Sequence, residues 1–113
     1  MKPSLLDVAL TDSTFVRVKT RDGDEVWEGR CIHCNRKLVV ELDGRAAKSV
    51  TIEHIVPQTA GGSDDLANLA LACARCNHKK GRQHDKKGLR DARASELIDA
   101  LLEKRRARWR NMV

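Results

Sequence analysis

An acid and an imidazole stand side by side in an otherwise apolar stretch, as Glu53 and His54 in TIEHIVPQTAGG (51–62). An imidazole titrates near neutral pH and can accept a proton. A carboxylate is a hard oxygen ligand for a divalent cation. Burying such a pair without partners is costly. Because a proline and a double glycine follow, we expect the pair at the end of a short strand, just before a turn.

Four cysteines form two pairs with the same spacing, Cys31-x-x-Cys34 and Cys73-x-x-Cys76. A two-residue gap lets a tight turn present both sulfurs to one ion, and four thiolates satisfy tetrahedral Zn²⁺. Such a site has no open position, so its binding energy becomes folding energy. We therefore predict one structural zinc ion. His33, inside the first pair, is predicted to be exposed and not a ligand, because the four thiolates already suffice.

The segment around the two cysteine pairs resembles the HNH endonucleases. The residues that carry the resemblance are IEHIVP…GG…DDLANLALACARCNHKKG, and it covers about residues 30–82. They combine acid-His-hydrophobic-x-Pro, a Gly-rich loop, Asn-Leu before an apolar strand, and Cys-x-x-Cys-Asn-x-x-Lys at a helix start. The resemblance implies a small α+β domain with a ββα-metal (HNH) core, held together by the four-cysteine zinc site.

The resemblance also implies roles for single residues. His54 would be the general base that activates water, and Asn68 would brace the Gly-rich loop and so orient the histidine. Glu53 and Asn77 would hold one catalytic cation, Mg²⁺ or Mn²⁺. Many relatives carry Asp and His at these two positions, which leaves the metal preference open, although an amide oxygen favours Mg²⁺ or Mn²⁺ over softer ions. His78 is an alternative to Asn77, but a helical neighbour points about 100° away.

Alternating apolar and polar residues predict the strands that must position this motif. The alternation on either side of Asp22-Gly23 predicts a hairpin within residues 13–29. Three further strands are predicted: KLVVEL (37–42), KSVTIEH (48–54) and LALAC (69–73). The first two of these could continue as a hairpin, and the turn-rich segment 57–68 is predicted to be a loop.

Two helices are predicted in the C-terminal half. The first begins at Cys76, with Gly81 and Gly88 as breakers. The second covers residues 91–112 and turns strongly basic towards its end. Its apolar stripe consists of Leu97, Leu101 and either Ile98 or Leu102. We expect a single domain in three parts: an N-terminal hairpin extension (1–29), the nuclease core with two zinc knuckles (30–88) and a C-terminal basic amphipathic helix (89–113).

Positive charge is concentrated in the last third of the chain. The net charge is +6; residues 1–78 carry 10 Lys/Arg and 11 Asp/Glu, whereas residues 79–113 carry 12 and 5. This pattern predicts a face that meets a polyanion, although a solvated helix face would have the same composition. His84 is predicted to be a surface residue or a phosphate contact. The predicted nucleic-acid contacts are Arg75, Lys79, Lys80, Arg82, Lys104, Arg105, Arg106 and Arg108, with Arg110 in the same tail cluster.

The sequence therefore predicts a metal-dependent HNH endonuclease that hydrolyses phosphodiester bonds in DNA, by nicking or double-strand cleavage. Double-stranded DNA is the expected partner. The composition holds one Phe, two Trp and no Tyr, which disfavours a platform of rings that stack on single-stranded bases. The chain has no run of about 18 apolar residues and no signal-peptide pattern, so we expect a cytoplasmic protein.

Two other readings remain open at this level. One is a non-catalytic zinc-stabilised module that binds nucleic acid or acts as an adaptor. The other is a subunit that associates with a protein partner, or with itself, through Leu97, Leu101 and Leu102 of the C-terminal helix.

Overall fold

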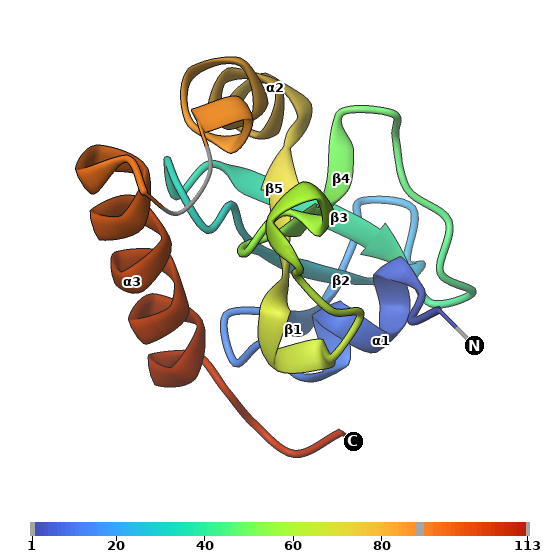
Figure 1. Cartoon of the computed structure of the whole chain (residues 1–113). Coiled ribbons are helices and arrows are strands. Elements are labelled where there is room, and N and C mark those ends of the chain that lie inside the picture. Colours follow the sequence, from blue (N-terminus) through green and yellow to red (C-terminus); the bar gives the residue numbers. More distant parts are fainter. Residues whose placement is uncertain (1, 88–89, 113) are drawn as a thin grey trace.

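The structure, a computed structural model, describes residues 2–87 and 90–112. Two antiparallel sheets form its centre and helices surround them (Figure 1). In chain order the elements are α1 (Leu5–Leu10), β1 (Val16–Lys19), β2 (Glu25–Arg30), β3 (Lys37–Glu41), β4 (Val50–His54), η1 (Gln58–Ala60), η2 (Leu66–Asn68), β5 (Leu69–Cys73), α2 (Ala74–Gln83), η3 (Asp85–Lys87) and α3 (Ala92–Ala107).

The first sheet has the order β1-β2-β3 and contains the predicted N-terminal hairpin. Val18 pairs with Val26 across that hairpin, and the turn between them uses Gly23 at a φ of 87°. The strands β2 and β3 are joined by the first cysteine pair, so this knuckle is itself the turn of a second hairpin. The sequence prediction of a hairpin within residues 13–29 is confirmed.

The second sheet is the antiparallel pair of β4 and β5, in which His54 faces Leu69 and Val50 faces Cys73. All five residues of β5 are buried, so this strand lies in the core. The predicted hairpin between the segments 37–42 and 48–54 is wrong. The strand β3 is already paired with β2 through the knuckle, and only an isolated bridge from Val40 to Ala46 lies beyond it.

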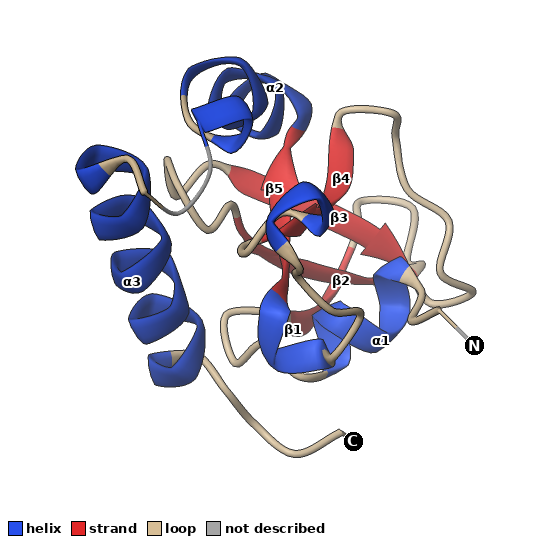
Figure 2. Ribbon diagram, viewed as in Figure 1, coloured by secondary structure: helices blue, strands red, loops and turns tan. Residues whose placement is uncertain are grey.

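Helix α2 follows β5 without a break, because Cys73 is both the last strand residue and the N-cap. The helix therefore starts at Ala74, two residues before the predicted start. Gly81 lies inside α2 and does not break it, and a Cβ at this position would meet no atom within 4 Å. Gly88, the other predicted breaker, and the predicted boundary after it lie outside the described residues. Together β4, β5 and α2 form the ββα unit expected of an HNH core (Figure 2).

Helix α3 begins at its N-cap Asp91, whose side chain accepts a hydrogen bond from the Ala94 amide, and it ends at Ala107. The predicted end near residue 112 is wrong because the following segment pairs with the chain after α1. The Ser13 amide donates to the Arg108 carbonyl (2.6 Å), and the Arg110 amide donates to the Thr11 carbonyl (3.2 Å).

The apolar residues of α3 pack inwards. Ile98 and Leu101 belong to the buried core, and Leu97 and Leu102 are half-buried against it. The stripe proposed as a docking surface is therefore largely used within the chain. Among the described residues, no helix has both the length and the apolar character needed to cross a membrane.

Candidate active site and zinc site

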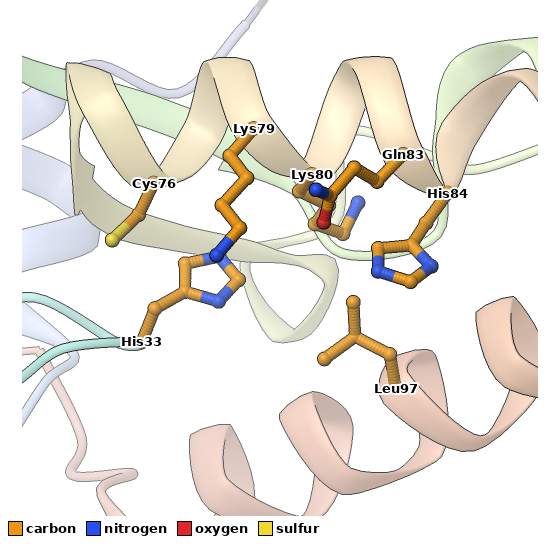
Figure 3. A pocket seen from close by; sticks show the side chains of 7 residues that line it. All are labelled: His33, Cys76, Lys79, Lys80, Gln83, His84 and Leu97. Carbon is orange, nitrogen blue, oxygen red and sulfur yellow. The ribbon is translucent and has the colours of Figure 1, made fainter.

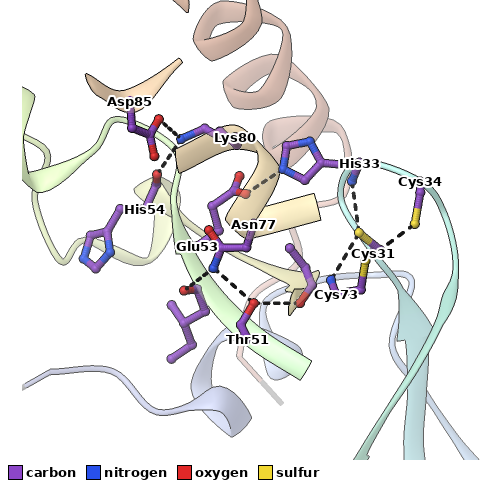
Figure 4. A network of polar contacts seen from close by, with 12 residues as sticks. Cys31, His33, Cys34, Thr51, Glu53, His54, Cys73, Asn77, Lys80 and Asp85 are labelled. Carbon is purple, nitrogen blue, oxygen red and sulfur yellow. Dashed lines mark hydrogen bonds and ion pairs between the residues drawn. The ribbon is translucent and has the colours of Figure 1, made fainter. Parts of the chain in front are cut away.

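The four cysteines gather at the junction of the two sheets. Their Sγ atoms all lie within 4.8 Å of one another. The Cys31 sulfur accepts hydrogen bonds from the backbone amides of His33 and Cys73, both at 3.4 Å (Figure 4). Burial, followed by hydrogen bonds with neighbouring sulfurs, raises the pKa of the Cys76 thiol to about 12. Four thiolates this close need a cation between them, and the donor set fits tetrahedral Zn²⁺.

The imidazole of His54 stands at the end of β4 and is held at two points. Its Nε2 lies 2.8 Å from Asp64 Oδ1, and its backbone carbonyl accepts a hydrogen bond from Lys80 Nζ at 3.1 Å. Lys80 also pairs with Asp85 at 2.7 Å. Lys80 is buried, so it does not lie on the surface as a DNA contact would (Figure 4). Its role is to tie helix α2 to the strand end that carries His54.

Asn68 is buried and holds the Gly-rich loop closed. Its Oδ1 accepts a hydrogen bond from the Val56 amide (2.8 Å), and its Nδ2 donates to the carbonyls of Val56 (3.1 Å) and Ser63 (2.9 Å). The loop passes so close that a Cβ on Gly62 would lie 1.8 Å from the Val56 oxygen. Only glycine fits there, and Asn68 makes the kind of side-chain-to-backbone bracing that the resemblance implied.

Glu53 points to the other side of β4 from His54, as side chains alternate along a strand. Its carboxylate is 1% exposed, and Oε1 lies 2.6 Å from His33 Nε2. The other oxygen, Oε2, is buried and has no hydrogen-bond partner among the described residues. The His33 side chain is only 15% exposed, so the prediction that it is exposed is wrong. The knuckle folds over β4, and the imidazole supplies a partner that the buried carboxylate needs.

Asn77 is the fourth residue of α2, at the end of the first turn, and it faces β4. Its Nδ2 donates to Thr51 Oγ1 (3.1 Å) and to the Ile52 carbonyl (3.3 Å), which leaves Oδ1 turned away from these bonds. Asn77 and His54 line one open cavity of about 340 Å³, together with Asp85 from the next turn. The resemblance implies a catalytic divalent cation. Glu53 Oε2 and Asn77 Oδ1 are hard oxygens of the kind that such a cation prefers, and neither accepts a hydrogen bond from the described residues, although Glu53 is not among the residues that line the His54 cavity.

A comparison with protein families finds a match, and it covers the segment that holds the candidate site. Residues 31–83 match the family model described as HNH endonuclease. This segment is therefore similar to the HNH endonucleases. The matched segment begins at the first zinc-site cysteine and ends with the last residue of α2, so it contains His54, Asn68 and Asn77. No curated protein and no solved structure matches the chain.

Several exposed cations lie on α2 and just after it. Arg75, Lys79 and Arg82 are exposed, which a contact with a polyanion requires, and their assignment as nucleic-acid contacts stays a prediction. Arg82 and the exposed Lys86 line a cavity of about 490 Å³ that Asn77 and His78 share. His78 does not line the cavity of His54, so Asn77 is the better placed of the two alternatives. Lys86 was not singled out from the sequence, where it is one of many lysines.

A further cavity, of about 250 Å³, lies between α2, the first knuckle and α3 (Figure 3). Lys79 extends from α2 towards His33 of the knuckle, and Leu97 lines the cavity from α3. His84 also lines it, half-buried, and its Nδ1 is buried with no hydrogen-bond partner among the described residues. This places His84 on the α3 side of the helix and away from the lining of the His54 cavity.

Two arginines of the tail cluster do not reach the surface. Arg105 is 1% exposed, and its guanidinium donates to the carbonyls of Leu69 (2.6 Å), Thr11 (2.8 Å) and Leu66 (3.2 Å), as well as to the Thr11 hydroxyl. Burial lowers the pKa of Arg105. Arg108 is also buried and donates to the Arg30 carbonyl at 3.1 Å. Their prediction as DNA contacts is corrected, because loop and strand carbonyls occupy their donors.

The rest of the tail cluster is divided. Arg106 is exposed and Lys104 is half-buried. Arg110 donates to the carbonyls of Leu10 and Ala9 and covers the ring of Trp27 at 5.3 Å. Only the first two of these residues remain available as surface contacts on α3.

Two residues with a role at the site were missed or misread from the sequence. Asp64, the partner of His54, stands in a loop where an acid is ordinary, and no periodic pattern singles it out. His33 was set aside because four thiolates complete the zinc site without it. The signal that could have found both is the same: the ionisable pair Glu53 and His54 on β4 needs partners, and His33 and Asp64 supply them.

Proposed function

We propose that the chain is a metal-dependent endonuclease that hydrolyses phosphodiester bonds in DNA. The observation that carries the proposal is the arrangement at β4 and α2. There His54 and Asn77 line one open cavity, and the buried carboxylate of Glu53 has an oxygen without a partner. The HNH family match supports nuclease chemistry for this segment.

In this proposal each side chain has one task. His54 takes a proton from the water that attacks the phosphorus, because an imidazole is a competent base near neutral pH. Glu53 and Asn77 would hold the divalent cation, which when bound supplies positive charge to the phosphate oxygens and the leaving oxygen. Asn68 holds the loop that faces His54. Lys80 fixes the strand end from which the imidazole projects.

Double-stranded DNA is the substrate we propose, held by phosphate contacts to the exposed cations of α2. Arg75, Lys79, Arg82 and Lys86 are exposed and belong to the helix, or to the turn after it, that also presents Asn77. Lys104 and Arg106 of α3 are candidates for more distant contacts. Such contacts carry little sequence information, so cleavage with little sequence preference is expected.

The test is a supercoiled-plasmid assay with zinc-loaded protein in Mg²⁺, in Mn²⁺ or with no added divalent cation. Nicked or linear product should require the cation and disappear in His54→Ala. Lys48→Ala, an exposed residue before β4, is the matched control and should cleave like the wild type. Zinc content and a cooperative thermal transition, measured for each variant, separate loss of chemistry from loss of fold.

Two outcomes would overturn the proposal. Cleavage that persists in His54→Ala would remove the histidine from its role. Salt-sensitive DNA binding by the folded protein, without cleavage in either metal, would support the non-catalytic adaptor instead.

A further inference from the structure

The contact between His54 and Asp64 determines which ring nitrogen can react. The two atoms, Nε2 and Oδ1, are 2.8 Å apart. The hydrogen bond from His54 holds the pKa of the Asp64 carboxyl below its usual value, so this group is ionised at neutral pH and can only accept. The hydrogen in this bond therefore resides on Nε2. In the neutral imidazole the lone pair is then on Nδ1.

The loop that carries Asp64 is fixed immediately before this residue. Asn68 holds the Ser63 carbonyl at 2.9 Å and the Val56 backbone on both its amide and its carbonyl. Gly62 approaches the Val56 oxygen too closely for any side chain. The buried Asn68 side chain and the close approach of Gly62 therefore fix the backbone of the loop next to His54. The contact between His54 and Asp64 thus does not depend on two freely moving surface side chains.

The histidine is fixed as well. Its backbone carbonyl is held by the buried Lys80, which is itself paired with Asp85. Both partners of the His54–Asp64 contact therefore come from restrained backbone, one at the end of β4 and one in the Gly-rich loop. A restrained donor and a restrained acceptor keep the ring in one orientation.

We propose that Asp64 is the positioning residue for His54: it anchors Nε2–H and leaves Nδ1 as the ring nitrogen that accepts the proton of water. The catalytic consequence rests on the proposed nuclease function, whereas the anchoring of the ring does not. In the reaction the water oxygen bonds to phosphorus as the bond to the leaving oxygen breaks. The proton of the water passes to Nδ1, and the leaving oxygen takes a proton from solvent. The negative charge of the Asp64 carboxylate then stabilises the positive charge of the resulting imidazolium.

The first test reads the ring directly and needs no cleavage. In ¹⁵N-labelled, zinc-loaded protein at a pH where His54 is neutral, two-bond proton–nitrogen correlations distinguish a protonated ring nitrogen from a bare one. We expect the wild type to show a fully protonated Nε2 and a bare Nδ1. In Asp64→Ala the two nitrogen shifts should move towards each other as the anchor is lost. In Asp64→Asn, whose amide oxygen still accepts a hydrogen bond, they should stay close to the wild type.

The second test measures cleavage. Asp64→Ala should lower kcat by roughly 10- to 100-fold, the range that follows removal of the hydrogen-bond partner that orients a metal-ligating histidine. KM should stay nearly unchanged, and Asp64→Asn should recover part of the loss. Asp65→Ala is the matched control, because Asp65 is exposed and its side chain makes no capping hydrogen bond.

The two tests fail independently. Nitrogen shifts of His54 that are identical in the wild type and in folded Asp64→Ala would overturn the positioning role, even if the protein cleaves DNA. Loss of the anchored ring in Asp64→Ala, in a protein that cleaves nothing, would keep the positioning role and overturn the proposed function alone.

Discussion

Helices α2 and α3 are both rich in Lys and Arg, but they place these side chains differently. On α2 the cations Arg75, Lys79 and Arg82 are exposed beside the candidate active site. On and just after α3, Arg105 and Arg108 are buried and donate to backbone carbonyls from distant parts of the chain. Basic residues on a helix therefore have two roles in this small protein: some are exposed to solvent, and others stabilise the fold by donating to buried carbonyls. Which role a basic residue has depends on the hydrogen-bond acceptors that face it, and not on the net charge of its helix.

The comparison has one exception on each helix. Lys80 of α2 behaves like the arginines of the tail, because it is buried between the His54 carbonyl and Asp85. Arg106 of α3 behaves like the residues of α2, because it is exposed. These exceptions supply matched pairs for experiments that would break or sharpen the comparison.

Removal of zinc should have the largest effect, and it should act on both helices at once. Structural zinc sites contribute on the order of 10 kcal/mol to folding. Cys76→Ser, or a chelator strong enough to take the metal, should abolish the cooperative thermal transition because α2 and the first knuckle lose their crosslink. Calorimetry beside metal analysis measures this. A zinc-free protein that still melts cooperatively at the same temperature would show that the cluster is not structural.

Arg105→Ala should have the next largest effect, and on stability. Hydrogen bonds to a charged group contribute about 1.5–3 kcal/mol each, and this substitution removes several of them and leaves the buried Leu69 carbonyl without the guanidinium, so we expect a loss of about 3 kcal/mol or more. Urea unfolding at constant m-value measures it. The control, Arg106→Ala, should change stability by less than about 0.5 kcal/mol. If Arg105→Ala left the stability unchanged and weakened DNA binding, Arg105 would be a DNA contact and not a structural residue.

Lys80→Met should cost less, about 1–3 kcal/mol, because it keeps the apolar stem but leaves the His54 carbonyl and Asp85 without the ammonium. Lys79→Ala, one residue away and exposed, should leave the stability near that of the wild type. Thermal unfolding of the pair distinguishes them. Equal melting temperatures for both variants would show that α2 has no inward-directed cation.

Arg82→Ala should have the smallest effect on the fold and act on binding. A lost phosphate contact lowers the dependence of log K on log salt by about 1, whereas stability should stay within about 0.5 kcal/mol. DNA binding titrated over a range of salt concentrations measures the slope. Arg21→Ala, in the exposed turn of the first hairpin, is the control with an unchanged slope. A drop in stability without a change in slope would place Arg82 among the structural cations.

Local patterns in the sequence were enough for the strands and for the cluster of four cysteines, whereas the brace at Asn68 was expected only from the resemblance to the HNH endonucleases. Alternation of apolar and polar residues, together with turn residues, predicts a strand from its local sequence alone. A repeated cysteine spacing predicts a shared metal ion. The pairing of β3 with β2 was not accessible in this way, because it depends on the first knuckle acting as a turn. The end of α3 at Ala107 depends on residues about a hundred positions earlier, which compete for the same backbone groups.

At the candidate site the same limit applies to side-chain partners. The motif placed His54 and Asn77 correctly on one strand end and one helix, and both line the same cavity. The partner of Glu53 could not be found from the motif, because His33 reaches it only after the knuckle folds over β4. The burial of Lys80 was hidden for a similar reason, since its acceptors lie on β4 and beyond the helix.

The hydrogen bonds of Arg105 also bear on how this protein should be dissected. A fragment cut at the borders of the family match, residues 31 and 83, would contain every proposed catalytic residue and every cysteine. It would nevertheless lack the guanidinium that satisfies the Leu69 carbonyl and the apolar residues of α1 and α3 that cover β5. The segment that defines the family is therefore smaller than the unit that folds, and a transplanted nuclease module should include both flanks.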